Sequence, residues 1–306
     1  MHQVLLLDKP LGLGSNAALQ RVRWLLGKPR AGHTGTLDPL ATGMLPICLG
    51  EATKFAGYLL SERKCYRASV HLGVATVSGD ADGEALAERP VPPLSAARIT
   101  EAMAAFIGRI RQRPPIYSAL KRDGVPLYRL ARAGVEVEVA EREVTIYRFE
   151  LLGFDATSLE FEVECGSGTY IRSLGPDLAL ALGTVGHLSA LRRLWVAPFA
   201  ERPMVSLAQI EQLSREAWRP GAEDAPPWLL PIDQALANLP QLRIDSAACR
   251  ALGFGQAVAG FAPADQPLRL YDPERHFLGL GRVGDDGLLR VQRLLTPPSG
   301  VSKPPS

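Results

Sequence analysis

The 306-residue chain lacks any apolar stretch that approaches the roughly 20 residues needed to cross a lipid bilayer. Its first seven residues carry no basic leader and only four consecutive apolar side chains. We therefore expect residues 4–7 to form a buried strand rather than a secretion signal. We also expect a cytoplasmic protein that has no membrane partner.

Cysteine is scarce too, and the few cysteines present are scattered. Cys48, Cys65, Cys165 and Cys249 form no C-x-x-C pair. This spacing is typical of reduced thiols in a cytoplasmic protein and argues against a zinc site. A metal at His33 is disfavoured for a related reason, because no second histidine lies near it in the sequence.

The net charge of the chain is also small, with a formal value of only +2 and an isoelectric point of about 8.4. Nucleic-acid-binding domains often exceed roughly 9. The distribution says more: residues 98–132 hold eight lysines or arginines against two acids, and residues 136–164 hold nine acids against two arginines. A basic arm beside an acidic sheet fits a protein that meets phosphate on one face, although two ordinary solvated faces would give the same pattern.

What the chain does contain is an alternation of helical and strand-like hydrophobic patterns. Helices are expected after a cap at Ser15 or Asn16, over residues 51–60, after a cap at Ser95, over 171–182, and from a capping box of Ser206 and Gln209 to residue 218. Strands are expected at residues 4–7, 45–49, 65–72, 135–139, 144–152, 159–164 and 187–196. The length predicts one large domain plus a small one.

The last third of the chain has a different character. Residues 219–227 (R-P-G-A-E-D-A-P-P) have the composition of a linker, and a short helix is expected at 231–239. Short strand patterns follow at 257–258, 268–271, 277–283 and 288–291, enough for a small β-barrel. The tail at residues 297–306 is expected to be disordered.

One run, at residues 32–43 (G-H-T-G-T-L-D-P-L-A-T-G), carries the strongest chemical signal. Its only acid is Asp38, and no other acid lies between Asp8 and Glu51. Pro39 disfavours helical backbone at Asp38, and the glycines at 32, 35 and 43 permit positive φ or close approach of another chain. The run predicts an ordered loop that presents one carboxylate; the alternative is a loop in which Asp38 only closes an Asx turn.

This run resembles the signature loop of the TruB family of tRNA pseudouridine synthases, and the following M-L-P-I-C-L-G-E-A-T-K-F at residues 44–55 continues the match. Further stretches follow in family order: K-P-x-G-x-x-S at 9–15, Tyr66 in K-C-Y-R-A, D-A-D-G at 80–83, Y-S-A-L-K at 117–121, G-T-Y-I-R at 168–172 and L-R-R-L at 191–194. On these stretches the chain is identified as a member of the family, of the bacterial stand-alone type.

The resemblance implies an α+β pseudouridine synthase fold, with a mixed, largely antiparallel sheet flanked by helices. It implies a catalytic domain at residues 1–236 with an inserted basic arm at about 98–134, and a PUA-like RNA-binding domain at 237–296. The implied activity is isomerisation of the uridine at position 55 in the T-loop of tRNA. The enzyme would need no cofactor, no metal and no protein partner, and we expect a monomer.

The resemblance also assigns three catalytic residues. Asp38 takes the place of the nucleophile, a role that suits a carboxylate because it is charged at neutral pH and can leave again. Arg172 takes the place of its partner, since a sheltered carboxylate drifts toward its neutral form unless a cation is near, and a guanidinium can hold it with two hydrogen bonds. Tyr66 matches the tyrosine that packs on the flipped uracil, although a strand tyrosine is commonly a core residue.

Five further residues are assigned to substrate binding. Tyr170 and Leu191 match residues of the pocket wall, and His33 matches the histidine that enters the tRNA loop where the nucleotide has flipped out. Asp80 is expected to support the pocket, and Lys9 is counted with the substrate-binding residues. Without the resemblance, the tyrosine and leucine would be read as core residues.

Two stretches depart from known patterns. Upstream of Asp80 the family often has T-D-T, whereas this chain has T-V-S at residues 76–78, so any role of the middle aspartate is absent or taken elsewhere. Residues 12–17 mimic a dinucleotide fingerprint, G-x-G-x-x-A, but the first glycine is too far from the strand and no acid ends a second strand about 20 residues later. We interpret residues 12–17 as a turn and a helix start.

Two other functions stay open at this point. One is an RNA-binding chaperone in which isomerisation is secondary; the intact set of Asp38, Arg172 and Tyr66 argues against it. The other is a guide-RNA-dependent synthase of the archaeal and eukaryotic kind; the inserted arm and the short C-terminal domain argue against that.

Overall fold

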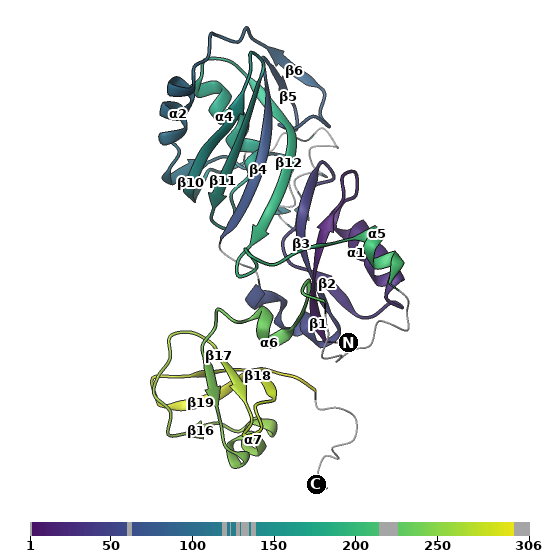
Figure 1. Ribbon diagram of the computed structural model, residues 1–306. Helices are drawn as coiled ribbons and strands as arrows, with labels where there is room; N and C mark the ends of the chain where they lie inside the picture. The colour runs from purple at the N-terminus through teal and green to yellow at the C-terminus, as the bar shows by residue number, and fades with distance from the viewer. Residues whose placement is uncertain are drawn as a thin grey trace.

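The computed structural model describes residues 2–59, 63–117, 121–122, 124–126, 129, 135, 139–213 and 226–296. Several expectations lie outside the described residues: the strand across 136–138, parts of the arm, the helix beyond residue 213, most of the 219–227 linker and the tail from residue 297. The described residues form two main sheets (Figure 1). A large sheet packs against helices, and a smaller sheet lies at the C-terminal end of the chain.

The large sheet has ten strands in the described part of the chain. In spatial order its main strands are β13 (Val205–Ser206), β1 (Gln3–Lys9), β3 (Ala41–Leu49), β12 (Gly186–Val196), β4 (Lys64–Leu72), β11 (Ser158–Cys165), β10 (Arg142–Phe154) and β7 (Gly108–Gln112). β14 (Leu229–Pro231) adds to β1, and β2 (Ala31–His33) adds to β3. β1 pairs with β13 and β3 with β12 in parallel, while the other pairings are antiparallel, which confirms the mixed, largely antiparallel sheet.

Alternating residues decide which face of each strand is buried. In β4, Ala68 and Val70 are buried whereas Arg67 is exposed, and β11 buries Phe161 and Val163 in the same way. Successive side chains of a strand point to opposite faces, so these apolar sets share one face of the sheet. The helices cover that face.

Helices α2 (Ala96–Ala104) and α4 (Ile171–Ala181) lie on the apolar face of β4 and β10–β12 (Figure 1). α2 begins at the predicted Ser95 cap and buries Ile99 and Met103. The helix ends at Ala104; Phe106 follows it and still packs against the same core, whereas Ile107 is half exposed because the chain turns there into β7.

The other helices largely follow the predictions, with two differences. α1 (Ser15–Leu25) has neither Ser15 nor Asn16 as its N-cap; that position is Gly14, because the Ser15 hydroxyl bonds a distant backbone instead. The helix expected at residues 51–60 is a 3₁₀ helix, η1 (Gly50–Leu59). α5 (Leu207–Gln212) carries the predicted capping box.

The smaller sheet curls around its own core. In spatial order its strands are β15 (Gln241–Arg243), β17 (Leu268–Tyr271), β18 (Phe277–Val283), β19 (Leu288–Leu294) and β16 (Val258–Ala259). α7 (Ser246–Gly253) packs Leu252 beside Leu270 and Leu289. In the described residues β15 and β16 are the two edges of this sheet, so the expected small barrel is an open half-barrel.

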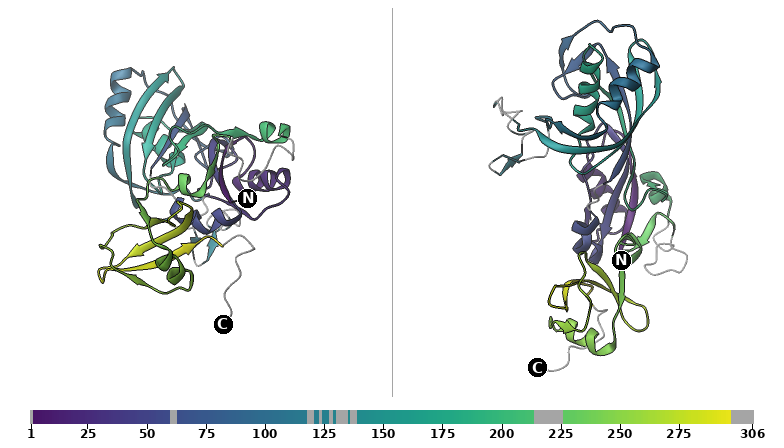
Figure 2. Two further views of the ribbon diagram at one scale, coloured as in Figure 1. Left: turned by 60° about the horizontal axis from the view of Figure 1, so that its bottom comes forward. Right: turned by 90° about the vertical axis from the view of Figure 1, so that its left-hand side faces the viewer.

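This unit docks on the large sheet through apolar contacts, at the end where η1 and α6 (Ile232–Ala235) lie (Figure 2). The ring centroids of Phe277 and Phe55 are 5.9 Å apart, and Leu280 shares a buried cluster with Val4 and Leu6. The two sheets therefore share a continuous interior rather than being joined by a free linker.

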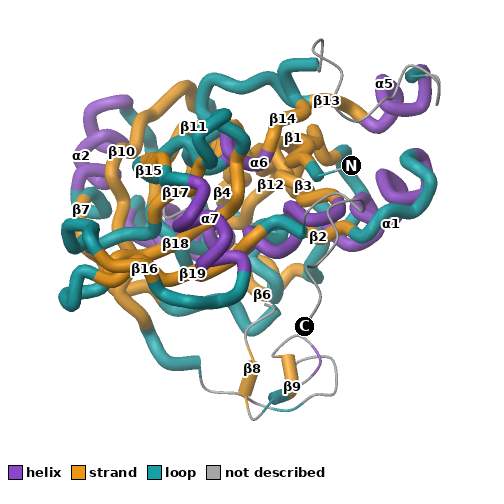
Figure 3. Tube along the Cα trace, turned by 90° about the horizontal axis from the view of Figure 1, so that it is seen from below, coloured by secondary structure: helices purple, strands orange, loops and turns teal. Residues whose placement is uncertain are grey.

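Two hairpins extend from the large sheet. β5 (Val74–Thr76) pairs with β6 (Ala85–Glu88) beyond the end of β4. The segment that joins β7 to β10 contains β8 (Lys121–Arg122) and β9 (Val125–Pro126), which lie away from the sheet (Figure 3). This second hairpin falls within the predicted basic arm.

Candidate active site

The loop between β2 and β3 is anchored on both sides of Asp38. The Ser15 hydroxyl accepts a hydrogen bond from the Leu37 amide at 2.7 Å and donates one to the Leu37 carbonyl at 2.9 Å. The Gly12 amide donates to the Pro39 carbonyl at 2.9 Å. The neighbours of Asp38 are thus fixed by the turn and helix start that the K-P-x-G-x-x-S stretch forms.

The end of the loop can only be glycine. Gly43 has a φ of +97°, and a Cβ atom there would lie 2.1 Å from the carbonyl oxygen of Arg193 on β12. Gly35 also has a positive φ of +78°, whereas Gly32 has neither a positive φ nor a close neighbour. The prediction for the glycines is therefore correct at two of the three positions, where β12 crosses behind the loop.

Arg172, near the start of α4, forms an ion pair with Asp38. Its Nε lies 2.9 Å from Asp38 Oδ2, with the side chain of Arg172 6% exposed and that of Asp38 41% exposed. The N–H is not aligned for a linear hydrogen bond. The predicted pairing is confirmed, but the contact is made through one nitrogen rather than two.

The two Nη atoms of Arg172 have other partners. Nη2 donates to the carbonyl of Tyr117 at 2.7 Å, and Nη1 donates to the carbonyl of Ser78 at 3.4 Å and lies 3.6 Å from Asp80 Oδ2. One guanidinium thus joins the Asp38 loop, the loop before β6 and the start of the arm.

The charge state of Asp38 is set by opposing influences. Burial raises the pKa of Asp38 above its ordinary value, the positive charge of Arg172 lowers it, and the negative charge of Asp80 raises it again. The net pKa is raised, so Asp38 needs its arginine to stay ionised. This agrees with the argument from the sequence.

A pocket of about 460 Å³ opens beside Asp38. Tyr66 and Leu191 line it, with exposures of 8% and 9%, and Tyr170 stands on the far wall. The Tyr170 backbone is fixed by the buried side chain of Gln112, which donates to its carbonyl at 3.0 Å and accepts from its amide at 2.8 Å. The pocket thus has aromatic and aliphatic walls and one carboxylate at its edge, dimensions and chemistry that suit a planar heterocycle.

Arg193 lies beneath this pocket and is only 1% exposed. Its Nε donates to the Met44 carbonyl at 2.7 Å and its Nη2 to the Gly35 carbonyl at 3.1 Å, so it ties together both ends of the Asp38 loop. Burial raises the pKa of Tyr66, and the positive charge of Arg193 and its hydrogen bond to the hydroxyl offset part of this rise.

A second hollow, of about 1010 Å³, lies on the other side of Asp38. His33, Asn16 and Tyr117 line it together with Asp38 and Asp80. Burial and the charge of Arg193 lower the pKa of His33, which favours a neutral ring at pH 7. Asp38 therefore lines two spaces, the pocket beside Tyr66 and the larger hollow beside His33.

The T-V-S stretch at residues 76–78 supports Asp80. The Ser78 hydroxyl donates to Asp80 Oδ1 at 2.5 Å and the Thr76 hydroxyl donates to the Asp80 carbonyl at 2.7 Å. Val77, at the position of the missing aspartate, lines the second hollow and is 44% exposed. The two polar residues of the stretch thus hold Asp80 toward Arg172, and an apolar residue faces the hollow.

Lys9 is the one predicted site residue that lies away from both pockets. It is fully buried, and its ammonium group donates to the carbonyls of Pro10, at 2.9 Å, and Leu13, at 2.5 Å. Burial lowers the pKa of Lys9 to about 8. In this structure Lys9 closes the turn behind the Asp38 loop.

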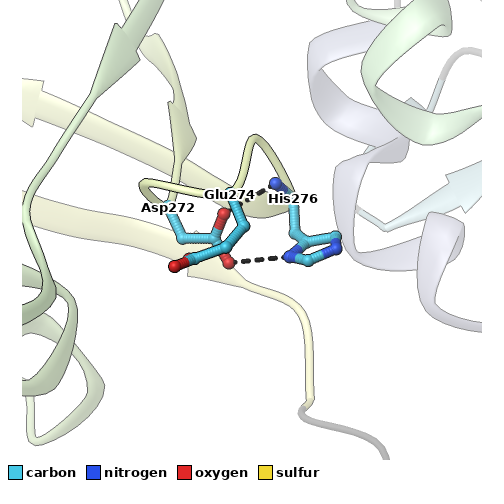
Figure 4. Close-up of side chains that lie close together, drawn as sticks. All are labelled: Asp272, Glu274 and His276. Atoms are coloured by element: carbon cyan, nitrogen blue, oxygen red, sulfur yellow. Dashed lines mark hydrogen bonds and ion pairs between the residues drawn. The ribbon is translucent and has the colours of Figure 1, made fainter.

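The described residues contain one group that offers three metal-ligand side chains, Asp272, Glu274 and His276 in the turn between β17 and β18 (Figure 4). Asp272 accepts hydrogen bonds from the His276 amide at 2.7 Å and from Nδ1 at 3.0 Å, so it caps this turn. Glu274 and His276 are exposed. No helix among the described residues is long and apolar enough to cross a membrane.

Three family descriptions match successive parts of the chain. Residues 23–171 match the N-terminal domain of TruB family pseudouridylate synthases, residues 172–237 match the tRNA pseudouridylate synthase B C-terminal domain, and residues 240–295 match the C-terminal region of pseudouridine synthase II TruB. The chain belongs to the TruB family.

Relatives within the TruB family are similar over nearly the whole chain. A tRNA pseudouridine synthase B of Xanthomonas axonopodis pv. citri is 49% identical over 96% of this chain and 94% of its own length. A protein of the same name from Coxiella burnetii is 46% identical over 95% and 94%. The family also agrees with the fold expected from the sequence.

Two solved structures of assemblies contain a chain with this fold. In a Cbf5–Nop10–Gar1 complex, one chain is 26% identical with a TM-score of 0.69, covering 96% of this chain and 84% of that one. The archaeal box H/ACA sRNP Nop10–Cbf5 complex gives 26% identity and a TM-score of 0.66, covering 92% and 79%. The pseudouridine synthase fold is therefore confirmed.

Sequence reasoning missed three residues that shape this TruB-family pocket. Arg193 lies within the matched L-R-R-L stretch, yet only the structure gives it a role, and Gln112 and Arg142 lie at the edge of the arm. A signal did exist for Arg142, because it is one of only two basic residues in the acidic segment 136–164.

Proposed function

We propose that this protein isomerises uridine to pseudouridine in tRNA, at position 55 of the T-loop, with Asp38 as the catalytic carboxylate. The observation that carries the proposal is the ion pair of Asp38 and Arg172 at the edge of a pocket lined by Tyr66 and Leu191. The relatives named tRNA pseudouridine synthase B support both the reaction and the substrate.

The reaction breaks the bond from ribose C1′ to uracil N1 and forms a bond from C1′ to C5. The electron pair of the broken bond goes to N1, which gains a proton, and the proton on C5 is lost to water. Nothing is oxidised or hydrolysed, so the balance requires no cofactor. An ionised Asp38 can serve as the nucleophile and be expelled again, whether it attacks the ribose or the base.

The remaining site residues follow from this chemistry. The target uridine is stacked within the RNA and has to be extruded, and an aromatic ring that replaces the lost stacking is worth roughly 1–3 kcal/mol. Tyr66 suits that role, Leu191 and Tyr170 form the walls, and Arg172 keeps Asp38 ionised. His33, in the second hollow, is suited to occupy the space that the flipped nucleotide leaves.

Asp80 and Lys9 act as supports in this proposal. Asp80 holds Arg172 from the side opposite to Asp38, while Lys9 fixes the turn that anchors the Asp38 loop. The test for Lys9 is contact with RNA: a cross-link from bound RNA to the Lys9 side chain would require the turn at residues 10–13 to rearrange.

We further propose that the protein acts on the T-arm of free tRNA as a cytoplasmic monomer, without a guide RNA or protein partner. The 49% identity to the Xanthomonas axonopodis relative, over 94% of that protein's length, supports this, because the chain of the Cbf5–Nop10–Gar1 complex is only 26% identical. A division into a catalytic domain at 1–236, carrying the arm, and a PUA-like RNA-binding domain at 237–296 is part of this proposal.

The deciding experiment measures tritium release from a T-arm hairpin that carries 5-labelled uridine, with purified protein and no other component. The wild-type protein is expected to release tritium to completion, and Asp38→Asn is expected to release none while still binding the hairpin. Binding without release by the wild type would favour an RNA chaperone. Release that required added protein or guide RNA would favour a guide-dependent synthase.

A further inference from the structure

Arg142 differs from the other arginines at the edge of the large sheet. The nearby arginines of β7 and β10 and the start of the arm all pair with glutamates: Arg109 with Glu143, Arg111 and Arg113 with Glu141, and Arg148 with Glu150 and Glu162. Among the residues that the structure describes, no carboxylate pairs with Arg142. Within the described part of the chain, this cation of an acidic segment thus has no acidic partner.

The register of the strands explains why. Arg142 stands opposite Gln112 and Glu143 stands opposite Arg111. Because side chains alternate along a strand, Glu143 and Arg111 project from one face and Arg142 and Gln112 from the other. The second face is the one that carries the base pocket, since Arg142 lines it and Gln112 holds Tyr170.

Arg142 lines this pocket, and two contacts fix its guanidinium group. Its guanidinium carbon lies 4.7 Å from the centroid of the Tyr170 ring, and its Nη2 donates to the Gly168 carbonyl. Gly168 has a φ of +86°, and a Cβ there would lie 3.4 Å from the guanidinium carbon, so the loop approaches closely because it has no side chain. Nε is buried and has no hydrogen-bond partner among the described residues.

Among the described residues, these contacts leave the charge of Arg142 without a carboxylate and its Nη1 without a hydrogen bond. Arg142 is half-buried and so stands toward the entrance of the pocket, whereas Tyr66 and Leu191 are buried in its interior. A nucleotide that places its base in the interior carries its phosphate to the entrance. A guanidinium is well suited to phosphate, because its planar fork can donate two parallel hydrogen bonds to an anion. An uncharged carbonyl of the base would leave the charge of Arg142 uncompensated.

We propose that Arg142 binds a backbone phosphate next to the flipped uridine and so positions the nucleotide in the pocket. The inference rests on the proposed function and deepens it, because it names a contact of the substrate backbone. Arg111 provides a matched control: its loss removes the same charge from the adjoining strand, but from the opposite face and from an ion pair.

The test measures hairpin binding between 50 and 300 mM KCl in an Asp38→Asn background, so that no turnover occurs. Each phosphate neutralised on single-stranded nucleic acid contributes about 0.7 to the slope of log affinity against log salt. Adding Arg142→Gln is expected to reduce the slope by about that amount and to weaken binding about tenfold at 100 mM. Arg142→Lys is expected to keep the slope, and Arg111→Gln to change neither value.

A second measurement does not depend on slopes. Hairpins with a single uncharged methylphosphonate linkage on the 5′ or the 3′ side of the target uridine are bound to the parent and to the Arg142→Gln protein. At one of the two positions, the uncharged linkage is expected to weaken hairpin binding by the Asp38→Asn protein about tenfold. The same linkage should weaken binding by the protein that also carries Arg142→Gln less than twofold, and this position identifies the contacted phosphate.

The proposal is overturned if Arg142→Gln keeps the parent slope, or if both linkages weaken the two proteins equally. In the Asp38-containing enzyme, Arg142→Gln is expected to raise KM about tenfold with kcat within twofold, as lost uniform binding requires. If the wild-type protein forms no pseudouridine, the proposed function fails; if it does and the Arg142 results are negative, only this inference fails.

Discussion

The two faces of the large sheet carry arginines in opposite electrostatic settings. On the outer face Arg67 and Arg148 reach Glu162 at 3.6 and 2.5 Å, and Arg192 reaches Asp8 at 2.8 Å. On the pocket face Arg193 donates to two backbone carbonyls and to the Tyr66 hydroxyl and pairs with no carboxylate among the described residues. Arg172 donates to two carbonyls besides its contacts with Asp38 and Asp80.

This difference in partners implies that the arginines of the two faces contribute unequally to stability and activity. Exposed ion pairs are worth roughly 0–1 kcal/mol each, so the outer face can change without much consequence. A buried guanidinium held by carbonyls keeps its full charge within a medium of low dielectric constant, where it acts strongly on nearby groups. We expect substitutions on the pocket face to have large effects and their counterparts on the outer face to have small ones.

The largest effect is expected from Arg172→Lys. A lysine cannot reach Asp38, Asp80 and the two carbonyls together, so Asp38 loses the cation that is fixed beside it. We expect kcat/KM to fall about 10²–10³-fold with the circular dichroism spectrum unchanged. Arg148→Lys, on the outer face, should stay within about twofold of wild type. Near wild-type turnover by Arg172→Lys would remove the ion pair from the mechanism.

The next effect concerns the crossing of the Asp38 loop and β12. Gly43→Ala introduces a side chain where φ is +97° and the Arg193 carbonyl oxygen would be 2.1 Å away. The two backbones have to separate, and we expect a loss of about 2–4 kcal/mol in the free energy of unfolding in urea. Gly32→Ala, in the same loop but with no atom within 4 Å, should change it by less than about 1 kcal/mol. Equal effects at the two glycines would contradict this account.

The third effect is expected from Arg193→Met, which is compared with Arg192→Met because the two arginines are adjacent in β12 and lie on opposite faces of the sheet. The variant leaves the carbonyls of Met44 and Gly35 without donors in a buried place, and unsatisfied buried groups cost about 1–3 kcal/mol. We expect the melting temperature to fall by several degrees and turnover to fall with it. Arg192→Met loses only the half-exposed pair with Asp8 and should melt close to wild type. A lower melting temperature for Arg192→Met than for Arg193→Met would show that the Asp8–Arg192 ion pair stabilises β12 more than Arg193 does.

The sequence predicts much of this fold because most elements have regular local patterns. The strands at 144–152 and 159–164, the Ser95 cap and the capping box of α5 all appear where periodicity places them. Patterns fail where the difference is subtle: residues 50–59 have a helical distribution of apolar residues, but apolar spacing does not separate a 3₁₀ from an α-helix.

The same distinction applies to the candidate site: residues in unusual local sequence can be predicted, and residues placed by long-range contacts cannot. Asp38 is visible in the sequence because its loop is unusual, and the resemblance brings Arg172 and Tyr66 to it. Arg193 and Gln112 could not be foreseen, since their partners lie 149 and 58 residues away and the contacts depend on strand register. Lys9 shows the opposite case: its motif indicates a substrate-binding residue, whereas its side chain is buried and bonds the carbonyls of Pro10 and Leu13.

The smallest expected effect is a shift of the pH profile by Asp80→Asn. The negative charge of Asp80 is one cause of the raised pKa of Asp38, and activity requires Asp38 in its ionised form. Removing that charge lowers the pKa of Asp38, so the acidic limb of kcat/KM should move to lower pH, by less than about one unit. The plateau should also fall, because Arg172 loses one of its partners, but the position of the limb is independent of its height.

Asp82→Asn is the matched control for this shift. Asp82 lines the same hollow, and its substitution removes the same charge. It is not among the groups that shift the pKa of Asp38. Its acidic limb should coincide with that of the wild type. If Asp80→Asn left the limb in place or moved it upward, the limb would report a group other than Asp38, and the electrostatic coupling across Arg172 would be too weak to influence catalysis.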